Sequence, residues 1–172
     1  MGTPRGFYFD LFFSHLFRRE HRRLSRRNKE SKRYEKQRII LSKVYQRRKN
    51  IVKDNLHKLS YYLVKENDVI YMEDLNINQL LQIQDDKQKK NKMIVSSLGE
   101  LVKLITYKAN MYDKQIHKIN RYYPSSQICS HCQKRHDIGD KEKYICPYCG
   151  AEIDRDINAA INIKNKGQLS FS

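Results

Sequence analysis

The sequence predicts an α/β protein in which helices alternate with short strands and a cysteine-rich segment precedes the last helix. Three observations favour this class. Apolar residues recur at intervals of three and four from Ile40 to Leu63, a compact apolar run occupies Val69–Met72, and all four cysteines of the 172 residues fall between positions 129 and 149. Apolar residues make up 39% of the chain, which suffices for a core.

The first half of the chain predicts basic helices followed by one strand. Residues 1–13 contain a Phe-Tyr-Phe-Asp-Leu-Phe-Phe run and fit either a short buried strand or a tail. A basic helix is expected over 14–27, a turn over 28–32, and a longer helix up to Asn67-Asp68. Val69–Met72 then predicts a buried strand.

The second half predicts two further helices, a strand and the cysteine segment. Residues 75–95 are rich in Gln, Asn, Asp and Lys and indicate a loop or a weak helix. A helix is expected to start at Ser97, because Ser97 and Glu100 have the spacing of a capping box. Gln115–Asn120 fits a strand, and Ile157–Lys166 predicts a final helix that ends at Gly167.

The positive charge is concentrated in the first third of the chain. The formal net charge is +16, and residues 1–60 hold 18 Lys and Arg against 5 Asp and Glu. Clustered cations favour nucleic-acid binding, because each neutralised phosphate releases counterions. A solvated helix face, a localisation signal or a basic helix on an anionic membrane remain alternatives. The candidate phosphate contacts are Arg18, Arg19, Arg22, Arg23, Arg26, Arg27, Lys29, Lys32 and Arg33.

Nothing in the chain predicts a membrane span or a secretory signal. No apolar run approaches the roughly 18–20 residues that a span needs, and Gly6–Phe17 lacks a small-residue cleavage site. We therefore expect a cytoplasmic or nucleoid-associated protein with reduced thiols and no membrane partner.

The cysteine spacing predicts a structural zinc site. Cys129-x2-Cys132 and Cys146-x2-Cys149 are separated by thirteen residues, and two such knuckles complete a tetrahedral four-thiolate shell. A closed shell leaves no position for substrate, so this Zn2+ is expected to be structural. A redox pair or two disulfides are the competing interpretations.

Two acids are candidates for a catalytic site. Glu73 follows the predicted strand, and Asp156 stands where the last helix begins. Carboxylates suit Mg2+, which serves phosphodiester hydrolysis by activating water and stabilising the leaving oxygen. The alternative is that Asp154 or Asp156 only caps the helix, since Asp is a favoured N-cap residue. Spacing alone does not bring Glu73 and Asp156 together.

Three motifs resemble the carboxy-terminal signature of the TnpB/OrfB family, insertion-sequence proteins related to compact CRISPR type V effectors. They are the run from Pro124 to Cys132, the Cys146-Pro147-Tyr148-Cys149-Gly150 knuckle, and Asp154-Arg155-Asp156-Ile157-Asn158-Ala159-Ala160-Ile161-Asn162-Ile163. Val69–Asn76 is similar to the family's second RuvC motif, and the likeness covers roughly residues 14–167.

The resemblance implies a partial RNase H-like RuvC core with basic helices and an inserted four-cysteine zinc ribbon. Members of the family are RNA-guided, Mg2+-dependent DNA endonucleases, so DNA and a guide RNA are the implied partners. The second and third family acids carry over to Glu73 and Asp156, and Arg155 is placed near the scissile phosphate. The expected organisation is an atypical segment 1–13, a partial RuvC-like core 14–125, a zinc ribbon 126–152, and the final motif and helix 153–172.

One departure from the family pattern bears on activity. The family's first acid ends a strand as Asp-x-Gly, whereas this chain has Asp10-Leu11-Phe12. Asp10 is therefore a poor match, and we expect a carboxy-terminal portion that depends on a missing amino-terminal half or a homodimer partner. The alternatives are a non-catalytic zinc-ribbon remnant or regulator that binds DNA or RNA, and a zinc-ribbon transcription accessory factor.

Overall fold

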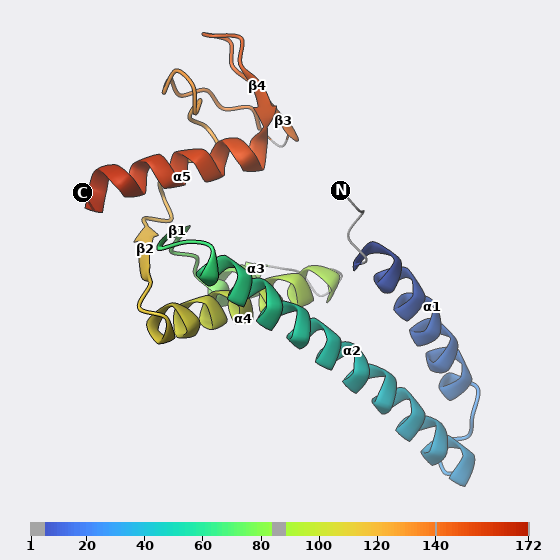
Figure 1. Cartoon of the computed structure of the whole chain (residues 1–172). Coiled ribbons are helices and arrows are strands. Elements are labelled where there is room, and N and C mark those ends of the chain that lie inside the picture. Colours follow the sequence, from blue (N-terminus) through green and yellow to red (C-terminus); the bar gives the residue numbers. More distant parts are fainter. Residues whose placement is uncertain (1–5, 84–88, 140, 172) are drawn as a thin grey trace. The chain divides into compact units, whose positions relative to one another are not determined.

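The computed structural model describes residues 6–83, 89–139 and 141–171, and the chain divides into two compact units, residues 1–58 and 59–172. The expected domain boundaries at residues 13, 125 and 152 stay predictions. The elements, labelled in Figure 1, are α1 (Gly6–Ser25), α2 (Lys32–Lys65), β1 (Val69–Glu73), α3 (Ile77–Ile83), α4 (Lys89–Met111), β2 (Gln115–Ile119), β3 (Lys143–Ile145), β4 (Glu152–Asp154) and α5 (Arg155–Phe171).

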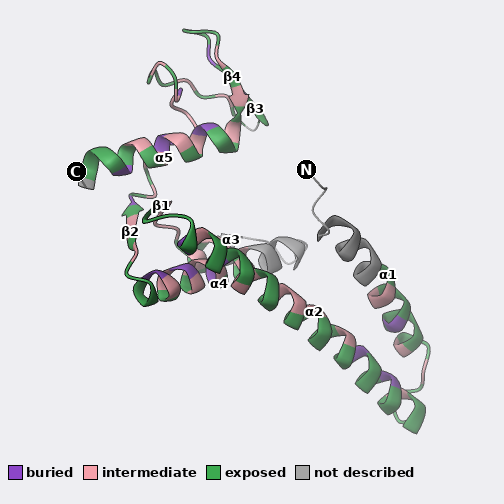
Figure 2. Ribbon diagram, viewed as in Figure 1, coloured by how far each residue is buried: buried purple, intermediate pink, exposed green. Residues whose placement is uncertain are grey.

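The first unit is a hairpin of α1 and the first part of α2. Ser31 begins α2 as its N-cap, because its hydroxyl oxygen accepts a hydrogen bond from the Tyr34 N–H at 3.1 Å. The two helices contact through an edge-to-face pair of the Phe17 and Tyr45 rings, 4.7 Å apart. Most of α2 is exposed, as Figure 2 shows in green, so the hairpin buries little apolar surface.

The second unit is built on a parallel pair of strands. β1 and β2 run parallel in the register Val69↔Gln115 to Glu73↔Ile119, and α3 and α4 form the crossover between them. The end of α2 and the inner face of α4 cover the pair through a core around Val64, Ile105 and Ala109. The predicted strand at 69–72 is confirmed, although it is half-buried and Val69 is exposed.

Two sequence expectations about where helices begin are wrong. Residues 6–13 continue α1 as helix and form neither a strand nor a tail, while the Asp10 side chain lies outside the described residues. α4 begins at Lys89, so Ser97 stands inside the helix and its capping box does not form. Asn76 instead caps α3, with its Oδ1 accepting from the Gln79 N–H at 3.1 Å.

The last helix also differs from its prediction. α5 continues through Gly167 to Phe171, and Gly167 is buried in the helix where α5 meets β1. A Cβ at position 167 would lie 2.6 Å and 2.7 Å from the Tyr71 Cε1 and Cγ atoms, and nearer still to Cδ1. Gly167 is therefore needed for close approach of helix and strand, not for ending the helix.

The cysteine segment forms a small module on α5. β3 and β4 pair antiparallel, and a core of Cys129, Tyr144 and Cys146 fills the space between the two knuckles. β4 leads directly into α5, which packs on β1 and β2 as well as on the module. In the described part of the chain, no helix is both long and apolar enough to cross a membrane.

Candidate functional site

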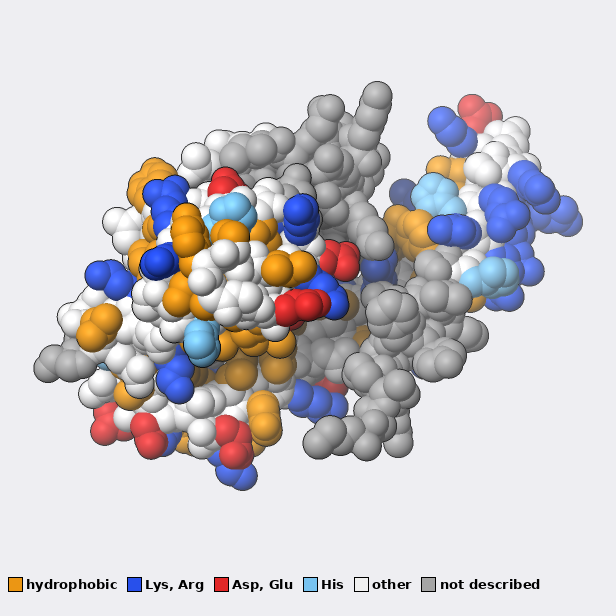
Figure 3. Space-filling model, turned by 90° about the horizontal axis from the view of Figure 1, so that it is seen from above, with side chains coloured by type: hydrophobic (Ala, Val, Ile, Leu, Met, Phe, Trp, Pro, Cys, Tyr) orange, Lys and Arg blue, Asp and Glu red, His pale blue; other side chains and the backbone are white. Residues whose placement is uncertain are grey.

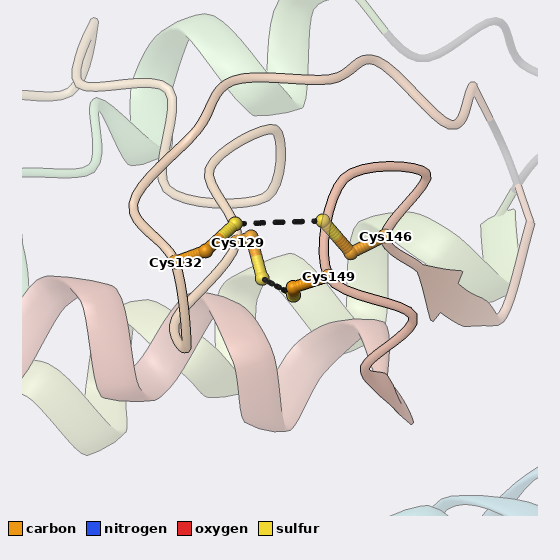
Figure 4. A group of neighbouring side chains, drawn as sticks. All are labelled: Cys129, Cys132, Cys146 and Cys149. Atoms are coloured by element: carbon orange, nitrogen blue, oxygen red, sulfur yellow. Dashed lines mark hydrogen bonds between the residues drawn. The ribbon is translucent and has the colours of Figure 1, made fainter.

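The four cysteine thiols converge on one point. Figure 4 shows two loops turning their sulfur atoms toward each other beside α5, and the four Sγ atoms lie within 4.8 Å of one another. The Cys129–Cys149 and Cys132–Cys146 sulfur pairs are 3.7 Å and 3.6 Å apart. These separations match the edge of a tetrahedron with zinc–sulfur bonds of about 2.3 Å, which is about 3.8 Å.

The same distances exclude disulfides in this geometry. A disulfide requires sulfurs about 2.05 Å apart, and all four thiols are free. Gly150 supports the second knuckle with a φ of 72°, and its N–H donates to the Cys146 carbonyl at 2.9 Å. The four cysteines are thus positioned to bind a metal ion.

The thiols do not ionise equally. Burial opposes ionisation of Cys146, but backbone N–H groups of Tyr148 and Cys149 donate to its sulfur and lower its pKa to about 6. At Cys149 the Ala151 N–H favours the thiolate, yet burial and the neighbouring sulfurs raise the pKa to about 12. A bound cation would offset this repulsion, so metal binding must displace protons from the cluster.

Tyr144 closes the inner side of the cluster. Its ring is fully buried, and its hydroxyl donates to the Gln127 carbonyl at 3.3 Å. Burial and the four neighbouring sulfurs raise the Tyr144 pKa to about 12, so the hydroxyl keeps the proton that it donates.

Glu73 and its neighbour Asp74 differ in their surroundings. Asp74 is paired with Lys118 at 3.0 Å and with Arg121 at 3.3 Å, and the Lys118 hydrogen bond lowers its pKa. Glu73 is half-buried at the end of β1, and burial raises its pKa while the Arg121 charge opposes the rise. Nearby positive charges therefore compensate the carboxylate of Glu73 less than that of Asp74, as expected for a residue that binds a cation.

At the start of α5 the two aspartates divide the roles that the sequence left open. Asp154 caps the helix, because its Oδ1 accepts from the Asp156 and Ile157 N–H groups at 2.9 Å and 3.1 Å. The Asp156 side chain is exposed and carries no capping role. Capping is thus confirmed for Asp154, while the catalytic assignment of Asp156 stays a prediction.

Helical spacing sets the side of α5 from which Asp156 projects. Asp156 and Gly167 are eleven residues apart, a separation of about three turns, so they share one helix face. Gly167 lies against Tyr71 of β1, the strand that ends at Glu73. Helical spacing therefore places Asp156 on the side of α5 that carries Gly167, where its side chain is exposed. Among the described residues, only the four cysteines form a group of three or more side chains that could hold a metal ion.

The predicted phosphate contacts are not equivalent. Arg19 and Arg23 bind the buried Glu20 carboxylate at 2.9 Å and 3.0 Å, and Arg27 donates to the Arg33 carbonyl at 3.2 Å. Figure 3 shows Lys and Arg side chains covering the hairpin unit at the right. The exposed cations outside the Glu20 cluster are Arg18, Arg22, Arg26, Lys29, Lys32 and Arg33. Arg155 belongs to the other unit and is half-buried at the first residue of α5.

Sequence reasoning missed several residues around these sites. Lys118 and Arg121, which bind Asp74, come from β2 and the turn after it, where no motif marks them. Asn158 and Asn162 were visible as a pair of polar residues four apart in the last helix, and this spacing was the signal that could have identified a buried contact.

Known families match two parts of the chain. Residues 14–84 match a family described as a probable transposase, OrfB_IS605, and residues 99–163 match the Cas12f1-like TNB domain. The chain is 35% identical to a putative RNA-guided DNA endonuclease of Streptomyces pristinaespiralis over 85% of its length, and 33% identical to the TnpB-like protein L79 of Acanthamoeba polyphaga mimivirus over 81%. A TnpB-like protein of Methanocaldococcus jannaschii, MJ0751, is 30% identical over 77%. The chain spans 36%, 27% and 49% of these three relatives, respectively.

Proposed function

This chain belongs to the TnpB/OrfB family of transposase-like proteins, and we propose that it is the carboxy-terminal nuclease portion of a transposon-encoded DNA endonuclease. The proposal includes a partial RNase H-like RuvC core, a zinc ribbon, DNA as substrate and a guide RNA as partner. The observation that carries it is the pair of acids, Glu73 and Asp156, on the strand and helix that meet at Gly167.

The residues fit a hard divalent cation better than a structural role. Glu73 is half-buried with a raised pKa, and neither it nor Asp156 forms an ion pair among the described residues. Carboxylate oxygens are the ligands that Mg2+ prefers, and a bound Mg2+ would supply water activation and stabilisation of the leaving oxygen. Arg121 stands close enough to oppose the rise in the Glu73 pKa and would add positive charge beside a phosphate.

Other residues of the chain would bind the structural metal ion and the nucleic acid. The ribbon would hold Zn2+ through Cys129, Cys132, Cys146 and Cys149, where four sulfurs suit a borderline-soft cation that binds no substrate. The hairpin unit would bind the nucleic-acid backbone through its exposed Arg and Lys side chains, and Arg155 would lie near the scissile phosphate.

The test is Mn2+- or Mg2+-dependent cleavage of labelled single- and double-stranded DNA by the purified chain. Glu73→Gln and Asp156→Asn are expected to abolish cleavage, and Asp74→Asn serves as the control because Asp74 is an adjacent, ion-paired acid. Cleavage that survives both substitutions would refute the site. If the chain is inactive alone, cleavage is measured again after adding the amino-terminal half of a relative and its guide RNA.

A second candidate function, nucleic-acid binding without cleavage, is favoured by the charge of the first unit and by the absence of a three-acid cluster from the described residues. It predicts binding that weakens with salt at a log–log slope of roughly −0.9 per contacted phosphate on B-DNA. Replacing Arg18, Arg26 and Lys29 by Ala should flatten the slope by about three such units. A charge-matched triple variant at Lys103, Lys164 and Lys166 should leave it unchanged, and an equal effect of both variants would remove the hairpin from the interface.

A further inference from the structure

Two asparagines of α5 are fully buried although they are polar. Asn158 and Asn162 are both 0% exposed, and a buried amide is costly unless its hydrogen bonds are made. They stand one turn apart on the same helix face, and their partners all lie in one backbone segment, residues 125–130, which leads into the first cysteine knuckle.

Asn158 forms hydrogen bonds with the backbone on both sides of Cys129, one of the four clustered cysteines. Its Oδ1 accepts from the Ser130 N–H at 2.9 Å, and its Nδ2 donates to the Ile128 carbonyl at 2.7 Å. These two backbone groups stand on either side of Cys129. One side-chain amide therefore holds the backbone of a metal-binding residue in the way a neighbouring strand would.

Asn162 reinforces the same contact from the next turn. Its Nδ2 donates to the Ile128 carbonyl at 2.6 Å and to the Ser125 carbonyl at 2.9 Å. Its Oδ1 has no donor among the described residues, whereas both polar atoms of Asn158 are satisfied. Asn158 is thus the more completely bonded contact of the two.

The first turn of α5 is also fastened to the ribbon on its other side. The Arg155 N–H donates to the Glu142 carbonyl at 2.9 Å, and β4 runs into α5 without a loop. Asp156 lies between this attachment and Asn158. Its backbone is held on both sides by a module whose order depends on metal binding.

We propose that Asn158 and Asn162 form a latch through which metal binding at the four cysteines orders the first turn of α5 and fixes the direction of the Asp156 carboxylate. The two asparagines are positioning residues: they bind the ribbon's backbone and act on Asp156 through the helix. Because coupling between two sites is reciprocal, the latch also raises the metal affinity of the cluster by the same factor. Only the use made of Asp156 rests on the proposed nuclease function.

The experiment is hydrogen–deuterium exchange of the full chain with Zn2+ bound and after chelation, in the wild type and in Asn158→Ala, Asn162→Ala and Asn158→Asp. Asn165→Ala is the matched control, because Asn165 lies on the same helix and makes no side-chain hydrogen bond to the described residues. Cobalt titration, followed by visible absorption, measures metal affinity and confirms a tetrahedral thiolate site in each variant.

We expect chelation to speed exchange at residues 156–161 by about tenfold in the wild type and in Asn165→Ala, and by less than about threefold in Asn158→Ala. Cobalt affinity should fall about tenfold in Asn158→Ala, the size typical of losing a partner that orients a metal ligand. Asn158→Asp keeps the acceptor for the Ser130 N–H but loses the donor to the Ile128 carbonyl. Its cobalt affinity should therefore lie between those of the wild type and Asn158→Ala.

Equal acceleration in the wild type and Asn158→Ala, or an unchanged cobalt affinity, would overturn the latch. If Asn158→Ala binds no cobalt while Asn165→Ala does, a side chain that is not a ligand controls the cluster, which supports the latch directly. Neither readout involves cleavage, so a chain without nuclease activity still tests this proposal.

Discussion

Replacing Gly167 by Ala should destabilise the second unit, although Ala is normally the better helix residue. In an unconstrained helix interior the substitution stabilises by about 1 kcal/mol. Here the new methyl group would lie 2.6 Å and 2.7 Å from two Tyr71 ring atoms, so the ring or the helix must move. Overpacking of this kind costs about 1–3 kcal/mol. The net expectation is a destabilisation of up to about 2 kcal/mol.

The cause is isolated by a double-mutant cycle with Tyr71. In a Tyr71→Ala background the methyl group has space, so Gly167→Ala should stabilise by about 1 kcal/mol and the coupling energy should be about 1–3 kcal/mol. Tyr71→Phe keeps the ring and should preserve the penalty. Because the chain holds no tryptophan, urea unfolding is followed by circular dichroism at saturating Zn2+.

The result also separates two roles for the glycine. If Gly167 only terminated the helix, the cost of Ala would be the same with or without the Tyr71 ring. Equal costs in the two backgrounds would therefore refute the close packing of α5 on β1. A penalty that disappears with the ring would confirm that this contact sets how α5 lies on the sheet.

Three further predictions concern metal, acid and hairpin. The purified chain should hold one Zn2+, which mass spectrometry can count, and should release it as pH falls because protons compete for the thiolates; a chain without metal would contradict the ribbon. Glu73→Gln should stabilise the metal-free chain at neutral pH but not near pH 4: a raised carboxyl pKa means that stability is lost as pH rises through it, and urea titrations at both pH values should show this difference. Gln37→Leu should cost about 1–3 kcal/mol, because Gln37 donates to the buried Glu20 carboxylate at 2.8 Å. The Gln37 bond lowers the Glu20 pKa, so this contribution is lost as pH falls, and Gln46→Leu, at an exposed site of α2, should change little.

Features with a local chemical cause could be predicted from the sequence. The cysteine spacing predicted a metal cluster because two short turns suffice to bring four thiols together. The strand at 69–72 was equally predictable, since an apolar run between turn signals needs no tertiary context, and the strand expected at 115–120 is present as β2. The capping box at Ser97 failed because the polar residues before it still support a helix, which starts eight residues earlier at Lys89.

Features set by tertiary contact were out of reach. Gly167 has the local signature of a helix end, and only the Tyr71 ring across the interface reveals a packing role. Glu20 and Gln37 resemble ordinary surface residues of basic helices until the hairpin buries them together. A family resemblance assigns Glu73 and Asp156, but it does not reveal that Asn158 and Asn162, which carry no charge, attach α5 to the backbone of residues 125–130.

The spacing of residues along α5 explains how one helix can pack on the zinc ribbon and on the β1–β2 strand pair. Asn158 and Asn162 face the ribbon, whereas Gly167 is nine residues from Asn158, or half a turn away around the helix axis, and faces β1. Contact with the strand at one face fixes where the helix lies, and the two amides at the opposite face fix its rotation. Asp156 is eleven residues from Gly167, so by helical spacing it projects from the same side of α5, and a rotated helix would change the direction of its exposed carboxylate. A metal-bound ribbon would thereby set the rotation on which any joint action of Asp156 and Glu73 depends.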